Sequence, residues 1–165
     1  MVTQWVDDHI QILYAEEYHR PDYNEMLSLV YDLMTKYQID KVYIDGANSS
    51  FIKSLRLQIG EEADYDKVIA RYRSEGYGDE AALNDMKVVP VNFNKVHKAM
   101  LRHCKMILEN EPRKIAINLV FDKLITSLRT AVDNDGTLDK ESTSYNDIFD
   151  AFRLAKFYHF EDSSS

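Results

Sequence analysis

The side chains of this chain that are best suited to chemistry are aspartates, and the first of them is Asp45. It follows the apolar stretch 42–44 and precedes Gly46. Valine, tyrosine and isoleucine favour a strand covered on both faces, and a glycine lets the backbone turn at its end. An acid at the carboxyl end of a strand is a usual place for chemistry in an α/β sheet, and equally a place for a turn aspartate that caps the next helix. Asp45 by itself leaves both interpretations open.

Two further acids, Asp147 and Asp150, lie three residues apart in a predicted helix over 145–158. This spacing puts both carboxylates on one helix face, together with Ala151 and Leu154. We therefore expect that face to pack against the sheet. Two half-buried carboxylates need compensation, which a bound metal ion would provide. The alternative is that both are acids of the first helical turn, where the helix dipole favours them.

A strand-end acid combined with acids on a late helix is typical of a carboxylate two-metal site. Divalent ions about 4 Å apart in such a site activate water and stabilise the leaving oxygen of a phosphodiester. Hard oxygen ligands favour Mg²⁺ or Mn²⁺. The combination predicts divalent-metal chemistry on a phosphodiester.

Composition limits the class of protein. The chain has 165 residues, 45% hydrophobic and 29% charged, which predicts one globular domain. Its net charge of −8 argues against a non-specific binder of nucleic acids, although metals or a basic partner could still serve a nucleic-acid enzyme. Neither a signal peptide nor a membrane span is evident, and Cys104 is the only cysteine, so we expect a cytoplasmic protein without an internal disulfide. We predict that Cys104 is a core residue and that His97 and His103 are structural or surface residues.

Hydrophobic periodicity predicts the elements that position these acids. Strands are expected over 2–6, 9–18, 42–45 and 88–93, with a tight turn at Asp7 and Asp8 and a strand or extended segment over 114–118. One helix is expected to begin at Pro21-Asp22. Further helices are expected to span 49–59, 95–110, 120–132 and 145–158. Residues 60–86 are rich in acids, which predicts a solvated insertion that includes a helix over 66–73. We expect a polar loop over 133–144 and a disordered tail over 161–165. The order favours an α/β fold with a mixed sheet flanked by helices.

Three passages resemble the nuclease domain of the large terminase subunit of tailed viruses, which has the ribonuclease H-like fold. Residues 42–55 are similar to that family's strand with a catalytic acid and the loop and helix after it. Residues 88–93, continuing into the helix from Lys95, are similar to its last core strand. Residues 115–118, 124–128 and 145–151 resemble its closing segment, where Asp147 matches the second acid of a pair and Asn146 stands in place of the first.

The resemblance implies a single ribonuclease H-like domain over 1–160 that cuts concatemeric viral DNA during genome packaging. Asp45 and Asp147 would bind Mg²⁺ or Mn²⁺, and Asp150 would assist. Apart from the resemblance, the basic side chains of Lys53, Arg56 and Lys95 are candidates for contacts with the phosphates of DNA. The implied partners are DNA and the terminase ATPase and portal-type packaging proteins, in the cytoplasm of a host cell if the gene is viral or from a prophage.

One departure from the family concerns its first strand, which carries an essential aspartate. Residues 2–6 match the second strand of the family, and Asp7 and Asp8 lie at the far turn, so we expect an incomplete metal site and a sheet lacking its first strand. The open sheet edge would favour a homodimer. Two alternatives stay open: a junction-resolving nuclease of the same fold, and a degenerate domain that serves as a protein-interaction or assembly module.

Overall fold

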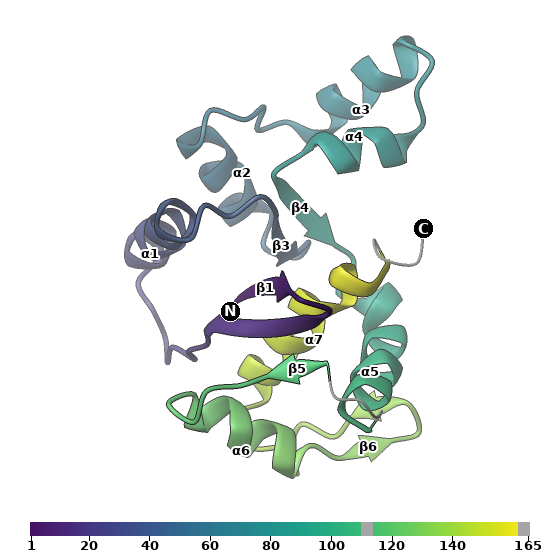
Figure 1. Ribbon diagram of the computed structural model, residues 1–165. Helices are drawn as coiled ribbons and strands as arrows, with labels where there is room; N and C mark the ends of the chain where they lie inside the picture. The colour runs from purple at the N-terminus through teal and green to yellow at the C-terminus, as the bar shows by residue number, and fades with distance from the viewer. Residues whose placement is uncertain (110–113, 162–165) are drawn as a thin grey trace. The chain divides into compact units, whose positions relative to one another are not determined.

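The chain folds as two compact units in the computed structural model, which describes residues 1–109 and 114–161 (Figure 1). The first unit comprises Met1–His19 and Asn94–Ser165, and the second comprises Arg20–Phe93. Both contain helices and strands, so the predicted α/β class is confirmed. No described helix is both long and apolar enough to cross a membrane. Of the predicted disordered tail, residues 162–165 lie outside the described part of the chain.

The first unit is built on a small mixed sheet. Its elements are β1 (Val2–Val6), β2 (His9–Tyr14), α5 (which starts at Phe93 and ends at Glu109), β5 (Ile115–Ala116), α6 (Asp122–Thr130), β6 (Asp133–Asn134), β7 (Thr137–Leu138) and α7 (Asn146–Glu161). The sheet order is β1-β2-β5, with β1 antiparallel and β5 parallel to β2. Asp7 and Asp8 have φ values of 47° and 68°, which confirms the predicted tight turn.

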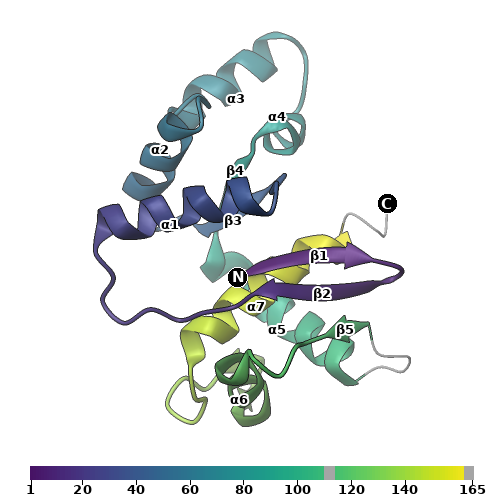
Figure 2. The ribbon, with the colours of Figure 1, turned by 60° about the vertical axis from the view of Figure 1, so that its left-hand side comes forward.

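The core of this unit joins the sheet to three helices. Ile10 and Ile12 of β2 are buried against side chains of α5, α6 and α7. The ribbons of these strands and helices are drawn in Figure 2. The helices contribute Leu101, Cys104, Leu124, Ile148, Phe149 and Phe152. Cys104 is 1% exposed, so the prediction that it is a core residue is confirmed.

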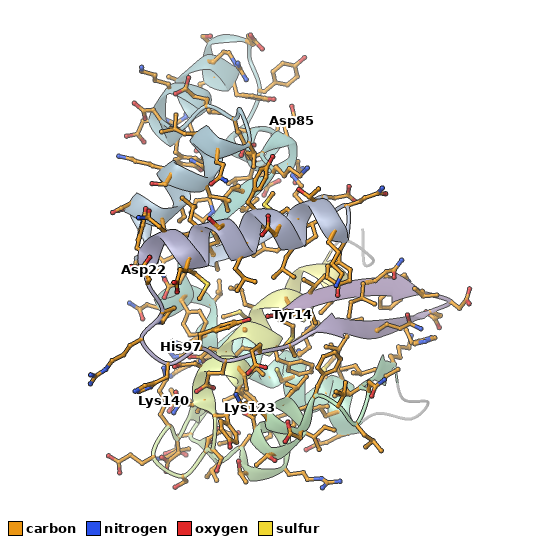
Figure 3. All side chains as sticks on the ribbon, turned by 90° about the vertical axis from the view of Figure 1, so that its left-hand side faces the viewer. Tyr14, Asp22, Asp85, His97, Lys123 and Lys140 are labelled. Carbon is orange, nitrogen blue, oxygen red and sulfur yellow. The ribbon has the colours of Figure 1, made fainter. Side chains whose placement is uncertain are left out.

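The second unit is built on a parallel pair of strands. Its elements are α1 (Tyr23–Lys36), β3 (Val42–Asp45), α2 (Ser49–Gln58), α3 (Tyr65–Ser74), α4 (Asp79–Asp85) and β4 (Val88–Val91). Asp22 starts α1 by accepting hydrogen bonds from the amides of Asn24 and Glu25 (Figure 3). The strands pair in register from Val42 opposite Val88 to Asp45 opposite Val91.

Helices cover both faces of the β3–β4 pair. Val42, Ile44 and Val88 pack with α1 and α2, whereas Tyr43 and Val89 pack with α3 and α4. This alternation follows from the two-residue period of a strand. Each residue of β3 is half-buried rather than fully buried, so the expectation of a strand completely covered on both faces is met only in part.

Two segments differ from the sequence predictions. Residues 60–86 are not only a solvated insertion, because α3 and α4 bury Val68, Ile69, Ala82 and Met86. The predicted polar loop over 133–144 contains the β6–β7 hairpin. The apolar positions of residues 60–86 are few and are surrounded by charges, so their buried face is hard to recognise before the partner strands are in place. The strands of the hairpin are only two residues each, which is too short for a recognisable pattern.

Candidate metal centre

Asp45 ends β3 at a sharp backbone turn beside β4. The amide of Gly46 donates a hydrogen bond of 2.8 Å to the carbonyl oxygen of Val91. A Cβ atom at Gly46 would lie 3.2 Å from that same oxygen, so glycine permits the close approach. The Asp45 Oδ1 atom accepts the amide of Ala47 at 3.1 Å, which fixes the side chain. Its Oδ2 atom makes no hydrogen bond within the described residues and is the atom that a metal ion would contact.

Asn92 is a polar neighbour that sequence reasoning did not single out. Because β3 and β4 are parallel and Asp45 pairs with Val91, Asn92 follows at the same edge of the strand pair. A side-chain amide oxygen is a hard ligand of the kind that Mg²⁺ accepts. Asn92 lies within the predicted strand over 88–93, and its polar side chain in that apolar segment was the signal that could have identified it.

Asp147 occupies the first turn of α7 and is exposed to solvent. The next residue, Ile148, donates its amide to the Glu17 Oε2 atom at 3.2 Å. The carboxylate of Glu17, which follows β2, therefore caps the start of α7, next to Asp147. The helix dipole favours negative charge at this end of the helix. Before the helix, the Thr143 hydroxyl donates to the Asp139 carbonyl and accepts the Val132 amide.

Asp150 is held by two cations. Its Oδ1 atom accepts a 2.7 Å hydrogen bond from Arg153, and its Oδ2 atom accepts a 3.1 Å bond from Lys140. The Arg153 guanidinium also donates to the carbonyl oxygen of His97 at 3.3 Å. With both oxygens engaged, Asp150 fits the role of a structural acid better than that of a metal ligand.

The three predicted site aspartates belong to different units. Asp45 lies in the second unit, and Asp147 and Asp150 lie on one helix of the first unit. Among the side chains that the structure describes, no group of three or more histidine, cysteine, aspartate or glutamate residues is arranged to hold a metal ion. Asp45 and Asp147 each offer a carboxylate oxygen that suits Mg²⁺ or Mn²⁺, and the joint site stays a prediction.

The three predicted DNA contacts have different surroundings. Lys53 and Lys95 are exposed. Arg56 is 1% exposed, and its guanidinium donates to the carbonyl oxygen of Val88 at 2.8 Å. This burial does not suit a contact with DNA, so the assignment of Arg56 is corrected to a structural role.

Burial shifts the pKa values of Cys104 and His103. Burial is the largest influence on Cys104 and raises the pKa of its thiol, which keeps the sulfur protonated and unreactive. Burial also lowers the pKa of His103, and the charge of Lys156 lowers it further. Both side chains therefore favour their neutral forms.

Comparison of the chain with known proteins found no match. The chain matches no protein-family model, and no curated protein or solved structure matches it.

The contact between Glu17 and α7 leads to a stability prediction. Glu17→Ala is expected to lower the free energy of unfolding by about 1 kcal/mol, because it removes a charged cap from a helix amide. Urea unfolding of the first unit can be followed by the fluorescence of Trp5, the single tryptophan. Glu16→Ala is the matched control, because Glu16 pairs with Lys123 at the surface and such pairs contribute little. An equal loss in both variants would contradict the capping role.

Proposed function

We propose that this chain is a divalent-metal-dependent DNA endonuclease domain of the ribonuclease H-like, terminase type. The observation that carries the proposal is the setting of Asp45. It ends a strand of a parallel pair, its Oδ1 atom is fixed by the turn, and its Oδ2 atom is not engaged by the described residues. The carboxyl end of a parallel strand is where α/β proteins usually place ligands.

Asp147 is the second proposed metal ligand. It is exposed in the first turn of α7, and it forms no ion pair with another described residue. Bound Mg²⁺ or Mn²⁺ would supply an activated water and stabilise the leaving oxygen of a phosphodiester. Asp45 and Asp147 would hold the ions, and Asp150 would orient Arg153 and the start of α7 from its ion pairs. The proposed substrate is DNA, and the proposed partners are the ATPase and portal-type proteins of a packaging machine.

A plasmid-nicking assay with Mg²⁺ or Mn²⁺ tests this activity. Asp45→Asn and Asp147→Asn are each expected to lower the nicking rate at least about 100-fold, because each removes an anionic ligand from the metal site. Asp40→Asn and Asp122→Asn are matched controls. Asp40 precedes the same strand, and Asp122 lies in the first turn of α6. Both controls are expected to cleave at the wild-type rate.

Metal binding has its own readout. Titration with Mn²⁺, followed by electron paramagnetic resonance, should show weaker binding in Asp45→Asn and Asp147→Asn than in the wild type and the two controls. Asp150→Asn should bind Mn²⁺ normally and lose stability instead. Equal nicking by all variants would overturn the assignment. So would a Mn²⁺-soaked crystal in which the Asp45 and Asp147 carboxylates lie more than about 8 Å apart.

A protein-interaction module is the second candidate function. The net charge of −8 and the ion pairs that occupy Asp150 favour it, because both weaken the case for a phosphate-binding catalytic site. Wild-type protein without nicking activity and without Mn²⁺ binding would support this candidate.

A further inference from the structure

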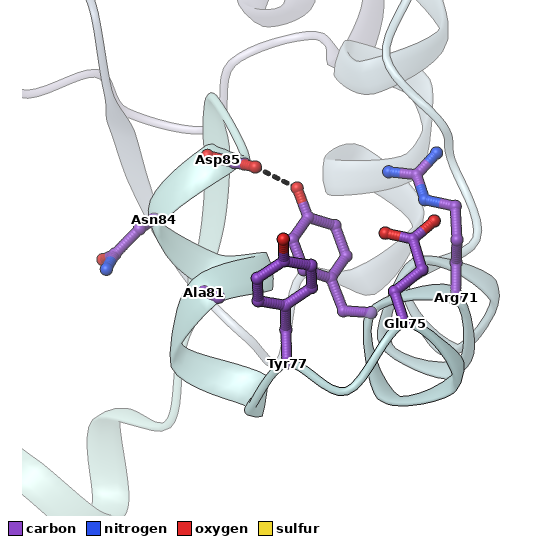
Figure 4. Close-up of a pocket in the computed structure, with 7 residues that line it drawn as sticks. Arg71, Glu75, Tyr77, Ala81, Asn84 and Asp85 are labelled. Atoms are coloured by element: carbon purple, nitrogen blue, oxygen red, sulfur yellow. Dashed lines mark hydrogen bonds between the residues drawn. The ribbon is translucent and has the colours of Figure 1, made fainter.

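A shallow pocket of about 620 Å³ opens between α3 and α4 in the second unit (Figure 4). Tyr72 and Tyr77 form its aromatic part, with ring centroids 6.0 Å apart and planes inclined by 59°. The side chain of Tyr77 is 57% exposed. In Figure 4 Glu75 lies on one side of the rings and Asp85 on the other. The proposed nuclease function uses none of these residues.

The Tyr72 ring is held by two contacts. The Tyr72 hydroxyl donates a hydrogen bond to the Asp85 carboxylate. The Arg71 guanidinium lies over the Tyr72 ring, 5.3 Å from its centroid. One tyrosine of the pair therefore holds a cation from the chain itself, while Tyr77 presents an exposed ring next to it. An exposed aromatic ring near carboxylates is suited to bind a second cation.

The charge of the surrounding segment agrees with this chemistry. Residues 60–86 contain eight acidic and three basic side chains, so the segment has a net charge of −5 out of −8 for the whole chain. Within the described residues, ion pairs engage two of those acids, Glu61 and Asp79. A partner with phosphate groups would be repelled, whereas a basic partner would be attracted.

We infer that the α3–α4 pocket is a docking site for a basic segment of a partner protein. An arginine or lysine side chain of the partner stacks on the Tyr77 ring, and Glu75 and Asp85 balance its charge. The site lies within the second unit and does not depend on the proposed nuclease function.

Fluorescence anisotropy of labelled peptides tests this inference on the full chain. The probe is an acetylated peptide of three Gly-Arg repeats, with three Gly-Lys repeats and three Gly-Glu repeats for comparison. Both basic peptides should bind and the acidic peptide should not. Tyr77→Ala and Glu75→Gln should each weaken binding about five-fold or more, because each removes one part of the cation site.

Matched variants separate the pocket from general electrostatic attraction. Glu62→Gln removes the same charge from the same segment outside the pocket lining, and Tyr31→Ala removes an exposed tyrosine from α1. Each should change the affinity less than two-fold. Asp45→Asn should bind the peptides like the wild type, whatever its nicking rate.

Three results would overturn the inference: no binding of the basic peptides, an equal loss in Glu62→Gln and Glu75→Gln, or binding of a single-stranded oligonucleotide that Tyr77→Ala abolishes. The last result would assign the pocket to nucleic acid. Amide spectra of each variant confirm that the fold is retained, which the exposure of Tyr77 favours.

Discussion

Lys156→Met is expected to stabilise the first unit by about 1–4 kcal/mol, which is the range found when buried charges are replaced by apolar side chains of similar volume. Lys156 lies on α7, and its side chain is fully buried, at 0% exposure. Its Nζ atom has no hydrogen-bond partner among the described residues. Methionine would keep the apolar contacts and remove the ammonium group.

The surroundings of Lys156 explain the cost of its charge. The Nζ atom lies 5.5 Å from the centroid of the Phe152 ring, which gives partial compensation. Burial is the largest influence and lowers the pKa of Lys156 below its ordinary value, while the nearby Cys104 thiol raises it by a smaller amount. The Cys104 thiol lies near the amine and favours its charged form, which offsets only part of the cost of burial.

The direction of this pKa shift predicts how the effect depends on pH. A lysine whose pKa is lowered on folding binds its proton more weakly in the folded state than in the unfolded state. The wild type therefore gains stability as the pH rises from the lowered folded pKa toward 10.5, the ordinary lysine value. The advantage of Lys156→Met should be largest below that window and should shrink as the pH rises through it.

Urea unfolding followed by Trp5 fluorescence, between pH 6 and pH 10, measures both effects. Comparing variant with wild type at each pH largely cancels the opposite influence of Cys104, whose raised thiol pKa lowers stability at alkaline pH. Lys98→Met is the control, because Lys98 is exposed on α5 in the same unit. A destabilised Lys156→Met protein, or a difference that does not vary with pH, would contradict the prediction.

Arg56→Ala is expected to destabilise the second unit by about 3–5 kcal/mol, the range for breaking a buried charged interaction. The Arg56 guanidinium donates to the carbonyl oxygen of Val88 through Nη2 at 2.8 Å and through Nε at 3.3 Å. The substitution leaves that buried carbonyl without these donors. It also opens a cavity beside Tyr65, whose ring centroid lies 5.8 Å from the guanidinium carbon.

Arg56 acts together with Glu61 at the start of β4. The Glu61 carboxylate accepts the amides of Lys87 at 2.6 Å and Val88 at 3.1 Å, and it lies 3.9 Å from the Arg56 Nε atom. The two side chains therefore satisfy the backbone at the beginning of β4 with opposite charges. Among the described strands, β4 pairs with β3 and no other, so Arg56 and Glu61 bond backbone groups that a further strand would otherwise bond.

Amide hydrogen exchange of α2 and β4 measures this loss, because Trp5 reports on the other unit. Arg129→Ala is the control, since Arg129 is exposed in the last turn of α6. It should change stability by less than about 0.5 kcal/mol. If the amides of Arg56→Ala exchange at the wild-type rate, the side chain does not secure β4 and the prediction is wrong.

Most elements of the fold could be predicted from local patterns. The apolar spacing of α1, α2, α5 and α7, and the alternation in β1 and β2, are properties of neighbouring residues. The sequence predicted a helix over 66–73, which corresponds to α3, but no helix at the position of α4, because Val68 and Ile69 form a short apolar group among many charges. Their burial depends on Tyr43 and Val89, which come from strands elsewhere in the sequence.

The amino-acid sequence determined the features that depend on neighbouring residues: the turn at Asp7 and Asp8, the cap at Asp22, and the Asp45–Gly46 strand end. Tertiary structure decided which polar side chains are buried and what they contact. It buried Arg56 and Lys156 and placed Asp150 between two cations. It also brought Glu17 to Ile148, 131 residues away along the chain. The physical reason is that a charged side chain takes its role from desolvation and from its partners, and both are set by packing between elements distant in sequence.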